Sequence, residues 1–526
     1  MKKLSVKILD YLKSKNNIVP NKCQISASRD IEKILKKNNF FNIFIFFKKN
    51  FYGIYIQGSI GVGKSLILKA LHVVYPKSEI FHFTDLIFHL QSTIPNKKFE
   101  NNFFKNIDLI LIDEFYINFL HIFFVFLQRR MVKQILNKNY TFVVTTPRGC
   151  TDLLISELQN LGAKKIRQRW GGAGFSGSVA LAYKVCLWSR IANRVLMPLK
   201  EFEIESTDDL YASAQHINWM EHLRVDGTLR VDCQIFRSPV ISHSHYAALK
   251  VKDAVVDQFR SKAGTRPSVD VKNPDIRVHV RVNEKLATFC LDLSGESLHR
   301  RGYRKEGNLA PLKENIAAAV LYRSGWPKVA VMGGALVDPM CGSGTLVIEA
   351  ALMAFDIAPG LLRSRPGFMG WTQHRESDWK MLLDEANDRR CIRERPSLAL
   401  IGTDKDPSAI ADARANAERA GINEYVKISE QDFRDSKPPT VDCGLLVTNP
   451  PYGERLGSEH ELRRLYADLG GLIKKRFDGW KAAVFTGRPD LGKELGMRAI
   501  LTNKFNNGSI DCRLFRFEVN EKFFVS

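Results

Sequence analysis

Residues 448–452, Thr-Asn-Pro-Pro-Tyr, place an amide, two prolines and an aromatic ring directly after an apolar run. Proline lacks an N–H donor and fixes φ, so a central strand cannot continue through it. The pattern predicts a strand that ends on a stiff turn, which delivers Asn449 and Tyr452 to the edge of a sheet. The side-chain oxygen of Asn449 and the carbonyl of Pro450 can accept the two N–H bonds of an aromatic amine, on whose ring Tyr452 can stack. Alone, the motif is also compatible with a turn that only ends a strand.

A second segment, GALVDPMCGSGTLVIEAALMA, reads as a strand, a glycine-containing turn and a helix. No Lys follows the glycines, as a P-loop requires, and the third glycine of a dinucleotide fingerprint is missing. An acidic strand end beside glycines suits a nucleoside that carries an amine and a carboxylate, such as S-adenosylmethionine. Two later strand ends, in LALIGTDKDP and VKISEQDF, supply carboxylates for the ribose hydroxyls and the adenine amino group. The predicted cofactor-binding residues are Asp338, Pro339, Cys341, Gly342, Gly344, Thr345, Asp404 and Asp432.

Four successive strand ends that face one edge predict an open α/β sheet of the Rossmann type. With this cofactor, the Asn-Pro-Pro-Tyr turn indicates methyl transfer to an exocyclic amino group, with Asn449, Pro450 and Tyr452 as the catalytic residues. The acceleration would come from orientation of a weakly nucleophilic nitrogen. The base must be unstacked or flipped to reach this turn. DNA adenine methyltransferases use a similar turn, so the turn alone does not decide the base.

Basic residues upstream favour a nucleic-acid partner. SHYAALKVKDAVVDQFRSKAG predicts an amphipathic helix with a basic side, and LHRRGYRKEG places Tyr303 among cations. A solvated surface would explain any one of these charges, but together they indicate a surface that follows phosphates. The predicted RNA-binding residues are Lys250, Lys252, Arg300, Arg301 and Arg304.

Near the N-terminus, FYGIYIQ, GSIGVGKS and LILKALHVV form the strand, glycine-rich loop and helix of a P-loop. About fifty residues later, IDLILIDEF predicts a buried strand that ends in two carboxylates. The predicted ATP-binding residues are Gly58, Gly61, Gly63, Lys64, Ser65, Asp113 and Glu114, of which Ser65 and Asp113 would hold Mg²⁺ with the nucleotide.

Composition changes near residue 147. The net charge of +22 divides into +13 for residues 1–147 and +9 for the remainder, and the cations change from 19 Lys and 3 Arg to 22 Lys and 34 Arg. This change in composition suggests that two coding sequences of different origin are joined near residue 147. We expect a multidomain α/β protein with a P-loop segment at 1–147, an α+β RNA-binding region at 148–312 and a methyltransferase domain at 313–526. Without an apolar run long enough to span a bilayer or a signal peptide, we expect a cytoplasmic protein with no membrane partner.

Residues from about 148 to 520 resemble the bacterial 23S rRNA guanine-N2 methyltransferases, through LDLSGESLHRRGYR, VDPMCGSGTLVIEAAL, DIAPGLLR and TNPPYGERLGSE. The resemblance implies a ferredoxin-like segment and a THUMP domain before the Rossmann-like domain. It also implies that the substrate is guanine N2 in large-subunit rRNA, free or in a precursor ribosomal particle, with no DNA partner. Many members continue into a guanine-N7 methyltransferase, which we do not expect in a chain that stops at Ser526.

Residues 50–146 resemble the ZapE-like family of AAA+ ATPases, through GIYIQGSIGVGKS, IFHFTDLIFHLQ and LILIDEF. The resemblance, which includes the strand YTFVVTT, ends before the helical lid of that family, so we expect weak or absent ATP hydrolysis. Two alternatives to the methyltransferase remain: an ATP-binding protein that acts on protein partners in cell division or quality control, and a non-catalytic RNA-binding assembly factor.

Overall fold

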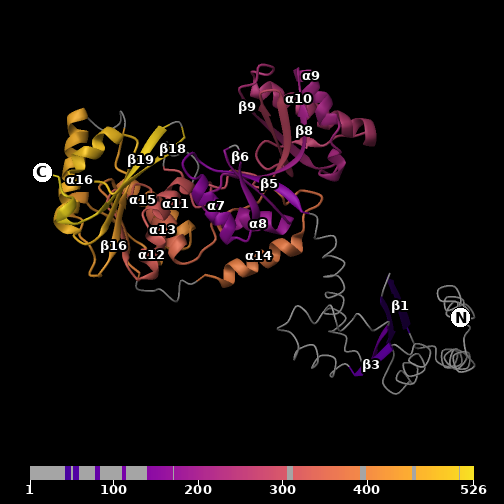
Figure 1. Cartoon of the computed structure of the whole chain (residues 1–526), viewed down its shortest axis with the longest axis horizontal. Coiled ribbons are helices and arrows are strands. Elements are labelled where there is room, and N and C mark those ends of the chain that lie inside the picture. The colour runs from indigo at the N-terminus through magenta and orange to yellow at the C-terminus, as the bar shows by residue number, and fades with distance from the viewer. Residues whose placement is uncertain are drawn as a thin grey trace, which may run out of the picture. The chain divides into compact units, whose positions relative to one another are not determined.

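The computed structural model describes residues 139–169, 171–304, 312–390, 398–452, 458–508 and 510–525, together with the backbone of four strands nearer the N-terminus (Figure 1). The chain divides into two compact units, residues 1–135 and 136–526. No helix among the described residues has both the length and the apolar character needed to cross a membrane.

The first unit contains a four-stranded sheet in the order β1-β2-β4-β3. β4 pairs parallel with both β2 and β3, whereas β1 pairs antiparallel with β2. The two strands that the sequence predicts on either side of the P-loop motif are therefore present, as β2 and β4. The strands are β1 (Asn42–Lys48), β2 (Phe51–Gln57), β3 (Ser78–His82) and β4 (Leu109–Asp113).

The second unit begins with an eight-stranded sheet in the order β10-β9-β11-β12-β8-β5-β7-β6. The long strand β8 pairs with β5 near its start and with β12 along its length, so it belongs to both halves of the sheet. The first half consists of β5 (Tyr140–Thr145), α7 (Thr151–Asn160), β6 (Lys164–Arg169), β7 (Gly172–Gly177), α8 (Val179–Trp188) and β8 (Arg194–Glu203). The second half adds α9 (Thr207–Gln215), η1 (Trp219–Glu221), β9 (Thr228–Phe236), α10 (Ser244–Ala263), β10 (Ser268–Val269), β11 (Ile276–Asn283) and β12 (Leu286–Asp292).

Strand β5 corrects the expected domain boundary. The sequence assigns YTFVVTT to the ATPase-like segment, but β5 pairs antiparallel with β7 and β8 in the second unit. Phe142 and Val144 are fully buried in the core that this sheet shares with α7 and α8. The division between the units therefore lies near residue 135, before β5, and not at residue 147.

A seven-stranded sheet in the order β15-β14-β13-β16-β17-β19-β18 completes the second unit. Its first five strands are parallel, and β19 and β18 add an antiparallel pair. Both faces are covered, because Leu445 and Val447 of β16 lie in one hydrophobic core and Leu446 between them lies in the other. The strands are β13 (Ala335–Asp338), β14 (Leu400–Asp404), β15 (Lys427–Glu430), β16 (Gly444–Thr448), β17 (Lys481–Thr486), β18 (Leu501–Asn507) and β19 (Ile510–Glu518).

Helices cover both faces of this sheet (Figure 1). The core on one face includes side chains of α11, α13 and α15, and the core on the other face includes those of α16. The helices are α11 (Glu314–Arg323), α12 (Trp326–Val331), α13 (Thr345–Ala354), η2 (Pro359–Leu362), α14 (Glu376–Asp388), α15 (Pro407–Arg419), η4 (Asn423–Tyr425), η5 (Phe433–Asp435), α16 (Glu459–Arg476), η6 (Pro489–Leu495) and η7 (Glu521–Phe523).

Residues 359–375 lie between Gly344 and Asp404 in the sequence, and they contact the eight-stranded part of the unit. The Phe368 ring stacks on Tyr183 of α8, with centroids 3.9 Å apart. The indole N–H of Trp371 donates to Nδ1 of His222 at 3.1 Å. These buried contacts hold the seven-stranded sheet and the eight-stranded sheet in one unit.

Candidate active site

The carboxyl ends of four parallel strands meet at one edge of the seven-stranded sheet. β14 lies between β15 and β13, and β16 lies beside β13, all in parallel register. Asp338 and Asp404 end β13 and β14, Asp432 follows β15, and Asn449 follows β16. This is the arrangement that the sequence predicts for these residues, and such an edge is where open α/β sheets bind ligands.

The loop after β13 is fixed to β14 by its backbone. The N–H of Cys341 donates to the carbonyl of Thr403 and that of Gly342 donates to Oδ2 of Asp404, each at 2.9 Å. Gly344 caps α13 with a φ of +81°, and a Cβ there would lie 3.2 Å from the Cβ of Ala413. A Cβ at Gly342 would meet nothing within 4 Å, so this face of the loop is open. The loop therefore offers a backbone surface that a ligand can approach closely.

Asp338 is a buried carboxyl group at the centre of this edge, with 1% of its surface exposed. The N–H of Met340 donates to its Oδ1 at 3.3 Å. Burial raises the pKa of Asp338 from its ordinary value to about 7. Burial also raises the pKa of the nearby Cys341 thiol well above its usual range, so the thiol stays protonated at neutral pH. Asp338 is thus poised to change its charge near neutrality.

The other predicted cofactor residues have partners of their own. Oδ1 of Asp404 accepts the N–H of Asp406 at 3.0 Å. Asp432 caps η5 and forms an ion pair with Arg434 at 3.1 Å, so a ligand amino group would compete with that guanidinium. The Thr345 hydroxyl contacts the Arg304 guanidinium.

The Asn-Pro-Pro-Tyr turn leaves one polar atom without a partner. Oδ1 of Asn449 is buried and accepts no hydrogen bond from the described residues. Pro450 is buried, and Tyr452 is half-buried. Burial raises the pKa of Tyr452, while the side chains of Asn507 and Asn449 act in the opposite direction. Because buried polar groups almost always have partners, the Asn449 oxygen is available to accept a hydrogen bond from a ligand.

Gly487, which follows β17, is a contact that the sequence analysis missed. A Cβ at this position would lie 2.6 Å from Cδ2 and 2.7 Å from Cε2 of Tyr452, so the tyrosine ring packs directly on the glycine. The signal in the sequence is a glycine after the fifth apolar strand, KAAVFTG, at the same edge as the other four strand ends.

The predicted RNA-binding residues occupy different environments. On α10, Lys250 pairs with Asp208 at 3.0 Å and Lys252 pairs with Asp253. Arg300 is exposed and pairs with Glu296 at 3.4 Å. Arg304 is mostly buried and donates to the carbonyl of Leu312 at 3.0 Å as well as contacting Thr345.

Arg301 is the residue whose predicted role the structure contradicts. Its side chain is 1% exposed and lies 3.5 Å from Glu349, which is fully buried. Its guanidinium donates to the carbonyls of Leu298 and Arg190, at 2.6 and 2.5 Å. In this fold the Arg301 guanidinium is part of the core and does not reach RNA.

The predicted ATP-binding residues other than Asp113 lie outside the described residues. These are Gly58, Gly61, Gly63, Lys64, Ser65 and Glu114; Asp113 is the last residue of β4.

The sheet order, the glycine loop after β13 and the antiparallel strands after β17 define the C-terminal part of the chain as a Rossmann-like methyltransferase domain. The α/β region before it is built on the single eight-stranded sheet. Family models match the same segments. Residues 141–196 match the RlmL ferredoxin-like domain, residues 205–292 the THUMP domain, and residues 301–516 the RMKL-like methyltransferase domain.

Individual relatives match about three-quarters of this chain. The chain is 53% identical over 386 residues to a protein of Syntrophotalea carbinolica named ribosomal RNA large subunit methyltransferase K/L, and 48% identical over 391 residues to one of the same name in Allochromatium vinosum. These alignments cover 73% and 74% of this chain but 54% and 53% of the relatives. The chain therefore spans about half the length of these curated relatives.

Solved structures share the fold. SMU.472, a methyltransferase candidate in complex with SAH, has a TM-score of 0.65 and 27% identity, over 73% of this chain and 99% of its own. A predicted N6-adenine-specific DNA methylase from Listeria monocytogenes has a TM-score of 0.64 and 28% identity, over 72% of this chain and 96% of its own.

Proposed function

We propose that this chain is an S-adenosylmethionine-dependent methyltransferase that methylates the exocyclic N2 of a guanine in large-subunit rRNA. The observation that carries the reaction is the buried, unpartnered oxygen of Asn449 at the end of β16. The relatives named as rRNA large subunit methyltransferases support rRNA as the substrate, and the THUMP match supports RNA binding. The substrate is free rRNA or a precursor ribosomal particle.

The turn would orient the amino group. When bound, the cofactor supplies an electrophilic methyl group. The lone pair of an aromatic amine is delocalised into the ring, so Oδ1 of Asn449 and the carbonyl of Pro450 would accept its two N–H bonds and aim the nitrogen. Tyr452, supported by Gly487, would stack on a base that has left its duplex or stack. A strong base is not required, because the proton becomes acidic as the new bond forms.

The residues at the strand ends fit the proposed cofactor. The open face at Gly342 accommodates the close approach of a ligand, and Asp338 and Asp404 lie at adjacent strand ends. We assign Asp338, Pro339, Cys341, Gly342, Gly344 and Thr345 to the loop that would hold the amino-acid part, with Asp404 at the ribose and Asp432 at the adenine. Asp432 would need to share its carboxylate with Arg434.

The pH dependence of cofactor affinity tests the place of Asp338. Burial holds its folded pKa near 7, above the ordinary value of 3.8, so the folded chain binds an extra proton between these values. The free energy of unfolding therefore falls as pH rises from 3.8 to about 7, where the buried carboxylate ionises.

The same ionisation affects cofactor binding. Because the ionised form attracts a cationic amine, the Kd for S-adenosylhomocysteine is expected to rise up to about tenfold per pH unit below pH 7. Calorimetric titration from pH 5.5 to 8.5 measures it, and Asp338→Asn should remove the dependence; a flat wild-type profile would place Asp338 outside the amine site.

Gly487→Ala tests the support of Tyr452. The added methyl group displaces the ring, so kcat for methyl transfer is expected to fall about 10- to 100-fold, since small misplacements of reacting groups cost this much. The control is Gly471→Ala on α16, where a Cβ meets nothing within 4 Å and alanine favours the helix. Steady-state kinetics of both variants, with circular dichroism, give the comparison. Equal activities would show that the ring position is unimportant.

The deciding experiment is transfer of labelled methyl from S-adenosylmethionine to undermodified large-subunit rRNA, followed by nucleoside analysis. N2-methylguanosine from the intact chain supports the proposal. Product on an adenine, or on DNA, would overturn the assigned base or substrate. Bound cofactor without product on either free rRNA or precursor particles would favour the alternative, an RNA-binding assembly factor.

For the first unit we propose nucleotide binding, with Mg²⁺ held by Ser65 and Asp113. The supporting observation is that β2 and β4 are adjacent and parallel, so Gln57, which precedes the glycine-rich motif, and Asp113 end at the same edge of the sheet. This is where a P-loop and its metal-binding carboxylate belong. Repeating the methyl-transfer assay with and without ATP tests any coupling; dependence on ATP would favour an active ATPase related to the ZapE-like proteins.

A further inference from the structure

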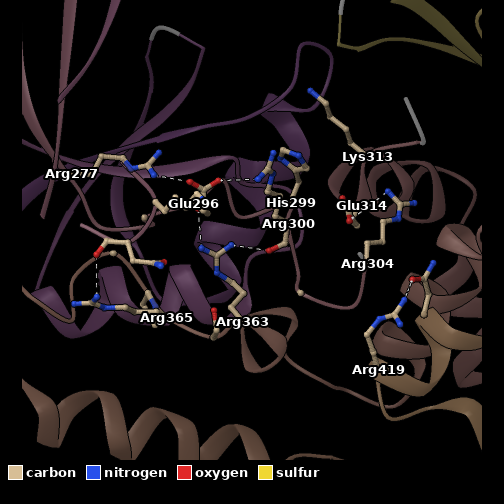
Figure 2. Close-up of a pocket in the computed structure, with 18 of the residues that line it drawn as sticks. Arg277, Glu296, His299, Arg300, Arg304, Lys313, Glu314, Arg363, Arg365 and Arg419 are labelled. Carbon is tan, nitrogen blue, oxygen red and sulfur yellow. Dashed lines mark hydrogen bonds and ion pairs between the residues drawn. The ribbon is translucent and has the colours of Figure 1, made fainter. Parts of the chain in front are cut away.

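A cavity of about 740 Å³ lies between the THUMP-matched residues and the methyltransferase domain (Figure 2). Residues 272–277 and 295–304 form one part of its wall and residues 363–367 another. The methyltransferase domain contributes Ser343 of the loop after β13, and Asn416 and Arg419 of α15. Of the predicted RNA-binding residues, Arg300 and Arg304 line the cavity, and no residue of the Asn-Pro-Pro-Tyr turn lines it.

The lining is strongly basic. It contains eight Lys or Arg side chains and three carboxylates, so five positive charges are in excess. Such an excess in a concave surface creates a positive potential that attracts anions. Six of the eight cations are arginines, and arginine can donate two parallel hydrogen bonds to a phosphate.

Two of these arginines are held by neutral groups. Arg363 donates to the carbonyls of Ser294, Glu296, Ser297 and Arg300, at 2.8 to 3.0 Å. Arg419 donates to the carbonyl of Tyr303 and to Oδ1 of Asn416, both at 2.6 Å. These bonds fix the guanidinium groups in place without neutralising their charge, as a site for a further anion requires.

The cavity is also connected to the proposed cofactor loop. The Asn416 side chain donates to the carbonyl of Ser343 at 2.9 Å, and Arg419 in turn donates to Asn416. Ser343 lies between Gly342 and Gly344. An anion on Arg419 would thus contact the same hydrogen-bonded group that supports the loop.

We propose that this cavity binds the phosphodiester backbone of the RNA substrate and so fixes its position relative to the methyltransferase domain. The proposal rests on the proposed function for the identity of the RNA. A polymer backbone fits better than a free phosphate because the cations come from five separate segments that surround a volume larger than one anion needs. Contacts of this kind position nucleic acid without reading its bases.

His299 provides a reporter inside the cavity. Its Nδ1 lies 2.8 Å from the hydroxyl of Ser297. Burial, and then the charges of Lys313, Arg301, Arg300 and Arg304, lower the pKa of His299 to about 3, so it is neutral at pH 7. A phosphate nearby would raise this pKa, because an anion favours the protonated imidazole.

The test uses the double variant Arg300→Gln with Arg365→Gln in the full chain. Their side chains are 58% and 41% exposed, and the matched control is Arg463→Gln, 40% exposed on α16 and outside the cavity. Binding of an unmodified large-subunit rRNA transcript is measured at several KCl concentrations. We expect the double variant to raise Kd about tenfold and to reduce the slope of log K against log salt by about 1 to 2, because each lost phosphate contact lowers it by about 1. The control should match the wild type, and all three should bind S-adenosylhomocysteine equally.

Two further measurements separate the outcomes. NMR titration should show the pKa of His299 rising by at least one unit with a short single-stranded RNA, and less with inorganic phosphate at the same phosphate concentration. If the double variant binds RNA with the wild-type slope while the wild type methylates rRNA, this inference is overturned and the proposed function stands. If the slope falls but wild-type protein methylates no rRNA, the proposed function is overturned and the RNA site stands. An equal response to inorganic phosphate and RNA would overturn the backbone assignment.

Discussion

Asn449→Ala is expected to lower kcat for methyl transfer about 10³-fold, the cost of removing a hydrogen-bonding group that acts on the transition state. The Kd for S-adenosylhomocysteine should change less than about twofold, because Asn449 follows β16 whereas the glycine-rich loop follows β13. The free energy of unfolding should stay level or rise by about 1 kcal/mol, because the lost oxygen is buried without a partner. Single-turnover kinetics, calorimetry and urea unfolding measure these three quantities.

Two variants make this result specific. Asn503 on β18 also has a buried side-chain oxygen without a partner among the described residues, but at the far edge of the sheet, so Asn503→Ala should keep full activity. Asn449→Asp keeps an acceptor and should retain more activity than the alanine variant. Wild-type turnover by Asn449→Ala, or equal losses in both alanine variants, would remove the turn from the reaction.

The sequence predicted the strands that hold this site because each has a local signature. Apolar runs end at Asp338, Asp404 and Thr448, followed by glycine, aspartate or proline residues that stop the strand. Their meeting at one edge follows from parallel pairing, which an α/β alternation predicts. Contacts between distant segments were not predictable in this way. Gly487 meets the ring of Tyr452 from 35 positions along the chain, and only the fold places them together.

Strand β5 shows the same limit at the level of domains. The segment YTFVVTT is predicted as a strand, and the structure contains it as Tyr140–Thr145. Its partners, β7 and β8, lie 27 and 49 residues beyond its end, measured to the first residue of each strand. A strand pattern does not specify which sheet the strand joins, so the change in composition and the resemblance over residues 50–146 placed the boundary after it.

The basic residues show why charge does not predict exposure. Arg300 and Arg301 are adjacent, yet Arg300 is 58% exposed and Arg301 is 1% exposed. The difference comes from Glu349, a buried carboxylate on α13 that needs a partner. Arg363, Arg365 and Arg419, which the sequence analysis did not select, line the cavity instead. Clustering in the sequence selected Arg300 and Arg304, which line the cavity, but also Arg301, which is buried in the core.

Arg301→Leu is therefore expected to lower the free energy of unfolding by about 3 to 5 kcal/mol, the usual cost of leaving one charge of a buried pair without its partner. Among the described residues, Glu349 would keep the hydroxyl of Tyr303 as its one hydrogen-bond donor, at 3.3 Å from its Oε1. The carbonyls of Leu298 and Arg190 would also lose their donor. Urea unfolding followed by tryptophan fluorescence measures the change.

The double variant Arg301→Leu with Glu349→Leu separates charge from packing. It removes the unpaired carboxylate, so it should recover at least half of the lost free energy, because apolar replacements of buried ion pairs are often tolerated. Arg300→Leu, at the neighbouring exposed position, should change stability by less than about 0.5 kcal/mol. If the Arg301→Leu protein had wild-type stability but bound RNA more weakly, Arg301 would be an RNA-binding residue as the sequence predicts. A residue that acts only in the core would have to lower the free energy of unfolding.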